Sequence, residues 1–160
     1  MSVLATIRPD DWNFPLLLHV IGALTLLGAL VTAGSAMVIG WKRETAVDAI
    51  TWARVSFRTL LIVALPAWFL MRIGAEWIAS KEGWNDVDDE PLWLGLGYLT
   101  AEAGGLLLLI SIILSGIGAR RLARSDAERG GTLVRVATVL ALLLVVAYVI
   151  VTWAMSAKPD

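Results

Sequence analysis

Four side chains that could move protons or bind a ligand stand inside stretches of sequence that are otherwise apolar. They are His19, Arg72, Glu76 and Glu102. His19 is the only histidine of the chain, and it lies within "FPLLLHVIGALTLLGALVTAG", residues 14–34. A charged group near the centre of a bilayer costs about 2.5–3.5 kcal/mol on insertion scales unless it is paired or hydrated. Such residues are therefore candidates for functional sites or for contacts between helices.

Helical spacing and depth predict that these residues share one pocket. Arg72 and Glu76 are four positions apart, as are two further polar pairs, and side chains four apart lie on one helical face. The pocket could carry protons or bind a polar headgroup or quinone. A structural reading also stays open, in which Arg72 and Glu76 reach the interface as a pair and His19 hydrogen-bonds a neighbouring helix. The predicted pocket comprises His19, Arg72, Glu76, Tyr98, Glu102, Tyr148 and Thr152.

His19 is also a candidate ligand for a metal ion or a haem. Haem iron takes axial ligands such as histidine and methionine, and copper(I) accepts the same pair. Met71 and Met155 both fall near the same end of their segments as His19. The candidate metal ligands are therefore His19, Met71 and Met155, with haem b or copper as the cofactor. A homodimer could instead pair two copies of His19.

Composition excludes several other classes of function. The chain has no cysteine, which rules out disulfides, iron–sulfur clusters and covalently attached c-type haem. Its formal net charge of -1 gives no reason to expect nucleic acid as a partner. No Walker motif, Gly-x-Ser-x-Gly elbow or His-Glu-x-x-His motif is present in the sequence. We therefore expect no hydrolase or NTPase activity.

Four apolar segments must position the polar residues. Of the 160 residues, 58% are hydrophobic, against about 45–50% in soluble proteins. Each segment reaches the ~20 residues that a helix needs to cross the hydrocarbon core. The first is expected to be retained, because its flank is acidic whereas a signal peptide has a basic one. The sequence predicts one all-α domain, residues 1–160, folded as a polytopic up-down bundle of four transmembrane helices. The segments are 14–41, 60–79, 92–117 and 136–155.

The distribution of basic residues predicts the orientation of the bundle. The loop at about 42–58 holds four lysines and arginines, the loop at about 118–135 holds five, and the other side holds three. The positive-inside rule therefore places both loops in the cytoplasm and both termini outside, in a bacterial-type plasma (inner) membrane. "GWKR" at 40–43 and "GARR" at 118–121 further indicate two parallel helical-hairpin repeats.

Small residues recur on one face of the first segment and predict close helix packing. They are Gly22, Ala29, Ala33, Ala36 and Gly40. Pro66 is expected to kink the second segment and to free a carbonyl about one turn back. "TAVD", residues 45–48, predicts a capping box that starts an interfacial helix leading into the second span. "SDAE", residues 125–128, predicts a second cap, and Gly130–Gly131 a break before the last span.

Two stretches resemble a known group of membrane proteins. "LLLHVIGALTLLGALVTAG" is similar to the first span of small bacterial four-span integral membrane proteins of unknown function. Those proteins look distantly similar to the membrane domain of the copper resistance protein D family. "VTWAMSAKPD" resembles the end of their last span, which runs into Lys-Pro. The resemblance implies a four-helix bundle in the inner membrane, with copper or another redox-active ligand at His19.

Two functions of different classes remain open at this point. The first is a non-enzymatic accessory or assembly subunit, which would contact the lipid bilayer and a larger membrane complex or a second copy of itself. The small-residue stripe and the short loops favour this function. The second is a ligand-handling membrane protein that binds haem, copper, protons or a small solute through His19 and the outer-leaflet carboxylates.

Overall fold

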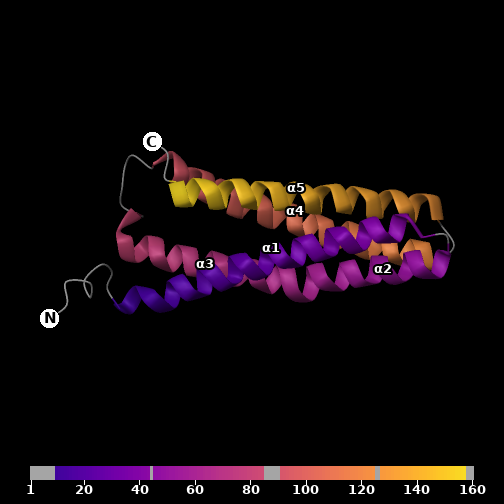
Figure 1. Ribbon diagram of the computed structural model, residues 1–160, viewed down its shortest axis with the longest axis horizontal. Helices are drawn as coiled ribbons and strands as arrows, with labels where there is room; N and C mark the ends of the chain where they lie inside the picture. Colours follow the sequence, from indigo (N-terminus) through magenta and orange to yellow (C-terminus); the bar gives the residue numbers. More distant parts are fainter. Residues whose placement is uncertain (1–9, 44, 85–90, 125–126, 158–160) are drawn as a thin grey trace.

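The computed structural model describes residues 10–43, 45–84, 91–124 and 127–157, and within these ranges the chain is helical with no strand. A short 3-10 turn, η2, at Asp10–Trp12 leads into the first long helix. α2 continues through η3 into α3 in one direction, whereas α1, the α2–α3 segment, α4 and α5 alternate in direction and form an elongated bundle, with the start of α1 and the end of α5 at one end (Figure 1). They are α1 (Asn13–Trp41), α2 (Ala46–Thr59), the π turn η3 (Leu60–Ala64), α3 (Leu65–Glu82), α4 (Leu92–Ala123) and α5 (Ala127–Ala157).

Four helical segments among the described residues are long and apolar enough to cross a membrane, which confirms the predicted fold class. We call the end of the bundle where α1 begins, α3 ends, α4 begins and α5 ends the terminal end. We call the opposite end, where α1 and α4 end and α2 and α5 begin, the basic end. The four segments are Asn13–Trp41, Ala46–Glu82, Leu92–Ala123 and Gly130–Ala157.

The helix that contains the second span begins at Ala46, well before the apolar segment 60–79, as the sequence predicted. Thr45 caps α2 as expected, because its Oγ1 accepts a hydrogen bond from the backbone N–H of Asp48 at 3.2 Å. α2 continues through η3 into α3, as expected of a helix that leads into the second span, and it packs against α1 and α4. The reason is its small buried face. Ser56 is fully buried there and donates a hydrogen bond to the Ala33 carbonyl at 3.0 Å.

Pro66 changes the backbone of this long segment in a specific way. Proline has no N–H and its ring displaces the carbonyl four residues earlier, so the ordinary α-helical ladder cannot continue. The structure accommodates this with the π turn η3, in which the backbone N–H of Leu65 reaches back five residues to the Leu60 carbonyl. The backbone hydrogen bonds therefore shift from a four-residue to a five-residue spacing just before the proline.

α1 and α3 cross with their backbones in contact. A Cβ at Gly74 would lie 2.5 Å from the backbone nitrogen of His19, and a Cβ at Gly22 would lie 2.8 Å from the Cα of Met71. Only glycine permits this approach, and glycine pairs of this kind let helices pack closely in lipid. The contact fixes the position of His19 against α3.

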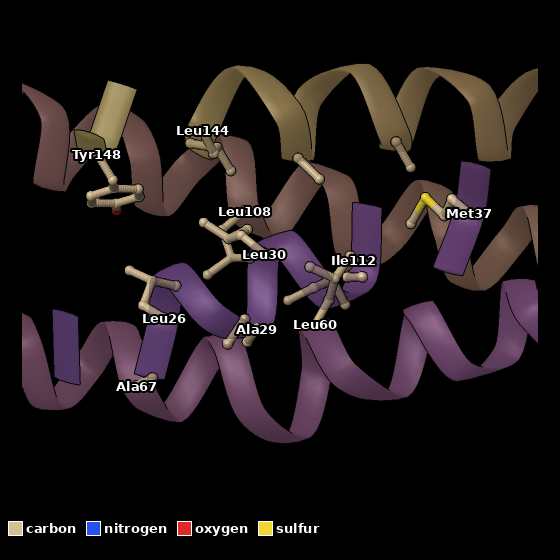
Figure 2. Close-up of a cluster of buried hydrophobic side chains, with 14 of the residues drawn as sticks. Leu26, Ala29, Leu30, Met37, Leu60, Ala67, Leu108, Ile112, Leu144 and Tyr148 are labelled. Carbon is tan, nitrogen blue, oxygen red and sulfur yellow. The ribbon is translucent and has the colours of Figure 1, made fainter. Parts of the chain in front are cut away.

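The small-residue stripe of α1 is buried along its length, and large apolar side chains fill the centre of the bundle. Gly22, Ala29, Ala33, Ala36 and Gly40 are all buried, with Gly22 against α3 and Gly40 against Trp52 of α2. Farther inside, all four segments meet in one cluster (Figure 2). Its fully buried leucines are Leu26, Leu30, Leu60, Leu108 and Leu144.

α4 and α5 form the second close pair, and here one prediction is wrong. Gly130 and Gly131 do not break the chain before the last span, because both lie inside α5. A Cβ at Gly130 would lie 2.8 Å from the backbone nitrogen of Leu122 and 3.0 Å from the carbonyl oxygen of Gly118. The glycine therefore serves the close crossing of α4 and α5 rather than a turn. Ser125 and Asp126 of the predicted second cap lie outside the described residues.

At the terminal end, side chains join α3 to the start of α1 within the first hairpin, and one aromatic pair joins the first hairpin to α4. Lys81 donates a hydrogen bond to Asp11 and lowers the pKa of that exposed carboxyl below its usual range. Phe14 meets Trp77 edge to face at 5.9 Å between ring centroids. Trp84 and Trp93 meet in the same way at 5.6 Å. Between these contacts and the core, α3 packs closely on α1 and only sparsely on α4.

The glycine crossing can be tested with a pair of substitutions on one helix. Gly22→Ala places a methyl group into the α3 backbone, and overpacking of this kind costs about 1–3 kcal/mol. Gly28 has open space around its Cα. Gly28→Ala should therefore leave the free energy of unfolding unchanged or raise it by up to ~1 kcal/mol. Denaturant titration of both variants in mixed micelles measures the difference, and equal stabilities would contradict the backbone contact.

Candidate functional site

Arg72 is the centre of a polar cluster between α3 and α4. Its Nε donates to Oε1 of Glu102 at 2.9 Å, and its terminal nitrogen donates to Oε2 of Glu76 at 2.5 Å. The guanidinium carbon also lies 5.4 Å from the centroid of the Tyr98 ring, within cation–π range. Four of the seven residues predicted to share a pocket are therefore together in the structure.

The cluster lies well inside the apolar part of the bundle. Arg72 is ten residues before the last residue of α3, and Glu102 is ten residues after the first residue of α4. Both positions are therefore about 15 Å along their helices from the terminal end. The Arg72 side chain is 24% exposed, whereas those of Glu76 and Glu102 are 50% and 63% exposed. The carboxylates thus face outward from the flank of the bundle.

Trp68 is a part of this site that the sequence reasoning missed. Its indole N–H donates to the Ala101 carbonyl of α4 at 3.0 Å. The ring takes the space that a side chain at Gly105 would need, with its Nε1 3.0 Å from the position of a Cβ there. Trp68 lies one turn before Arg72, so the two side chains together span the gap between α3 and α4. The adjacent glycines of α4 at 104 and 105 were the available signal in the sequence.

His19 does not join this cluster through the contacts that the structure gives it. Its Nδ1 lies 3.0 Å from the backbone carbonyl of Met71. Because a carbonyl oxygen only accepts, Nδ1 carries the proton in this arrangement, and Nε2 of the neutral ring keeps a free lone pair. Met71 faces α1 while Arg72, the next residue, faces α4. His19 and the carboxylates therefore contact different sides of α3.

Tyr148 and Thr152, the remaining residues of the predicted pocket, have separate environments. Tyr148 is buried, with 6% of its surface exposed, and its ring lies against Gly104, so that a Cβ there would be 2.6 Å from its hydroxyl. Among the described residues this hydroxyl has no hydrogen-bond partner. Thr152 is exposed and donates to the Tyr148 carbonyl at 2.7 Å. The Tyr148 hydroxyl is therefore a buried polar group near, but outside, the Arg72 cluster.

The predicted metal ligands lie on three helices, with His19 on α1, Met71 on α3 and Met155 on α5. Met71 is buried, with its backbone against Gly22 of α1. The side chain of Met155 lies against Gly97 of α4. In the part of the chain that the structure describes, no group of three or more His, Asp or Glu side chains could hold a metal ion. A ligand at His19 would therefore depend on Nε2 and on groups outside this set.

The arrangement around Arg72 carries a net charge of about −1 when both carboxylates are ionised. One guanidinium cannot neutralise two carboxylates, so the flank of the bundle attracts a cation, a proton or hydrogen-bond donors. Ionisable groups at this depth in a spanning segment are functional candidates by default.

The role of Arg72 can be tested by removing the cation and then the anions. Arg72→Gln leaves Glu76 and Glu102 without their charged donor, and we expect a loss of about 1.5–3 kcal/mol in the free energy of unfolding. The triple variant Arg72→Gln, Glu76→Gln, Glu102→Gln should recover most of this loss because no unpaired charge remains. Denaturant titration in micelles gives all three values. A triple variant as unstable as Arg72→Gln would show that charge pairing is not the cause.

Comparison of the chain with known proteins found no match. No family model matches the chain. No curated protein and no solved structure matches it either. What the protein does must therefore be inferred from its own side chains, above all from the exposed carboxylates around Arg72 and from His19.

Proposed function

We propose that the protein is an accessory or assembly subunit of a larger membrane complex, without catalytic activity of its own, and that it docks through the flank around Arg72. One observation carries the proposal. Glu102, inside a helix apolar enough to span a membrane, is 63% exposed on the surface of the bundle. Lipid tails offer no hydrogen bonds to a carboxylate, so such a group faces protein or a water-filled cavity.

The charge of the cluster defines the chemistry of the partner. With one arginine for two glutamates, the flank lacks positive charge and donors. Two copies of the chain meeting at this face would bring their surplus carboxylates together, and like charges repel strongly where water is absent. We therefore infer a different membrane protein whose helix presents a lysine, arginine or hydroxyl at this depth, rather than a homo-oligomer.

The proposed setting is a bacterial-type inner membrane with both termini outside. The support is the excess of lysine and arginine in the 42–58 and 118–135 segments, which the positive-inside rule assigns to the cytoplasm. In this orientation the Arg72 cluster lies in the outer half of the bilayer. The partner helix would then carry its complementary group in the outer leaflet.

The docking proposal predicts a selective loss of the partner. Wild-type protein extracted in mild detergent should co-purify with a stoichiometric membrane protein. Glu102→Gln keeps the size of the side chain but removes its charge, and we expect the partner to be reduced at least about ten-fold, equivalent to 1.4 kcal/mol.

Glu128→Gln is the matched control for that experiment, because Glu128 is an exposed glutamate at the basic end. It should retain the partner fully. Native mass spectrometry measures the ratio of partner to protein in each preparation. A wild-type protein that purifies alone, or equal losses in the two variants, would overturn the docking proposal.

A second candidate function rests on the hydrogen bond of His19. A histidine whose Nδ1–H is fixed by a backbone carbonyl presents Nε2 in a set direction, which is the usual arrangement of histidine ligands to metals. This observation supports a ligand-handling protein that binds haem b, copper, protons or a small solute at the terminal end. Met71 and Met155 remain the proposed soft co-ligands in the same half of the bundle.

His19→Asn separates the ligand role from the structural one. The asparagine amide can still donate to the Met71 carbonyl, but it removes the Nε2 lone pair. If His19 is a ligand, purified wild-type protein should show a Soret band or near-stoichiometric copper, and His19→Asn should lose it while keeping its thermal stability. Absorption spectra and metal analysis give the answer. A stable wild-type protein that is colourless and metal-free would exclude haem and copper at this site.

A further inference from the structure

The strongest feature that the proposed function does not use is a cavity at the basic end, between α2 and α4. Its volume is about 320 Å³, the equivalent of roughly ten waters at ~30 Å³ each. Four arginines line it in two pairs, each four positions apart: Arg54 and Arg58 on α2, and Arg120 on α4 with Arg124 directly after that helix. A single phosphate group with its bound water would fit this space easily.

The cavity exists because α4 is built from small residues where it faces α2. Gly116, Ala119 and Ala123 form that wall. The Phe57 ring lies directly on Gly116, where a Cβ would be 2.8 Å from the ring. Farther along, the alanines leave open space that no side chain of α2 fills. Packing of the two helices therefore creates both the hollow and the basic rim around it.

The four arginines lack internal counter-ions in the part of the chain that the structure describes. The ion pairs found there involve only Arg72 and Lys81 as cations. Arginines four apart on one helix repel each other, and this cavity brings two such pairs face to face. An anion with several oxygens would relieve that repulsion, and the planar guanidinium fork matches a phosphate group in two-point contacts.

The surroundings favour a lipid over free phosphate. On α4, Ile113 and Ile117 are exposed and share a helical face with Arg120 and Arg124, on the side toward the middle of the bundle. On the other wall, Arg58 is followed by the exposed Leu61. Each wall thus passes from arginine at the end of the bundle to apolar side chains deeper in. A headgroup and its acyl chains have the same order of polarity, and basic pockets between membrane helices bind anionic headgroups.

We propose that this cavity is a binding site for an anionic phospholipid, with the four arginines holding its phosphate and the apolar flanks contacting its acyl chains. The proposal goes beyond the accessory role and does not rest on it, because the site lies at the opposite end from the Arg72 cluster. It concerns the lipid bound to this chain itself, so it can be tested on the purified protein without any partner.

The test uses delipidated protein to which defined lipids are returned. Phosphatidylglycerol or cardiolipin should bind to wild type at about one lipid per protein and raise its unfolding temperature, whereas phosphatidylcholine should not. Arg54→Gln with Arg120→Gln should weaken binding at least about ten-fold by removing one fork from each wall. Arg43→Gln with Arg135→Gln is the matched control, since it removes the same charge from the same end without touching the cavity, and it should bind as wild type does.

A second variant separates the effect of the cavity from misfolding and from a general loss of positive charge. Ala123→Phe keeps all four arginines and changes an exposed residue near the end of α4, yet it fills the cavity, so lipid binding should fall as in the arginine variant. Native mass spectrometry counts the bound lipids. Equal losses in the two double variants, or unchanged binding in Ala123→Phe, would overturn the proposal. So would inorganic phosphate that stabilises the protein at millimolar concentration and displaces the lipid, since the site would then be one for free phosphate.

Discussion

The structure depends on one constraint, which is that a polar group inside an apolar bundle must find a partner within the protein. Lipid supplies none, and each unsatisfied group costs several kcal/mol. Three polar side chains meet the constraint by bonding to backbone carbonyls of neighbouring helices: Ser56 to Ala33, Trp68 to Ala101, and His19 to Met71. These bonds also tie the helices together. The buried hydroxyl of Tyr148 is an exception among the described residues. The Glu76 and Glu102 carboxylates, half or more exposed, stand out because Arg72 alone cannot satisfy them.

Glycine decides where such bonds can form. At Gly22 and Gly74 the backbones of α1 and α3 touch, so the short reach of an imidazole is enough to join them. α3 and α4 lie farther apart, and only long side chains such as Trp68 and Arg72 connect them. The bundle therefore consists of two tight pairs joined loosely near the terminal end, and the looser joint is the one that carries the charge.

The fold was predictable from the sequence because it depends on composition and length, whereas the site depends on helix rotation and distance. The spacing of Arg72, Glu76 and Glu102 and a common depth were enough to place them together. The separation of His19 was not predictable, because Met71 and Arg72 are adjacent and lie ~100° apart on the helix, so they face different neighbours. The π turn before Pro66 further changes the direction in which the side chains of α3 face. The role of Trp68 was not predictable, because a side chain that bridges two helices is recognised only when the distance between those helices is known.

The sites at the two ends of the bundle share one packing arrangement, but their net charges are opposite. On α4, Gly105 admits the ring of Trp68 and Gly116 admits the ring of Phe57, so an aromatic side chain sits between separated helices at each end. Arginines accompany both rings. At the terminal end Arg72 meets two carboxylates, which leaves a surplus of negative charge. At the basic end the four arginines around the cavity meet no carboxylate among the described residues. The partner proposed for the first site would therefore supply positive charge, and the lipid proposed for the second would supply negative charge.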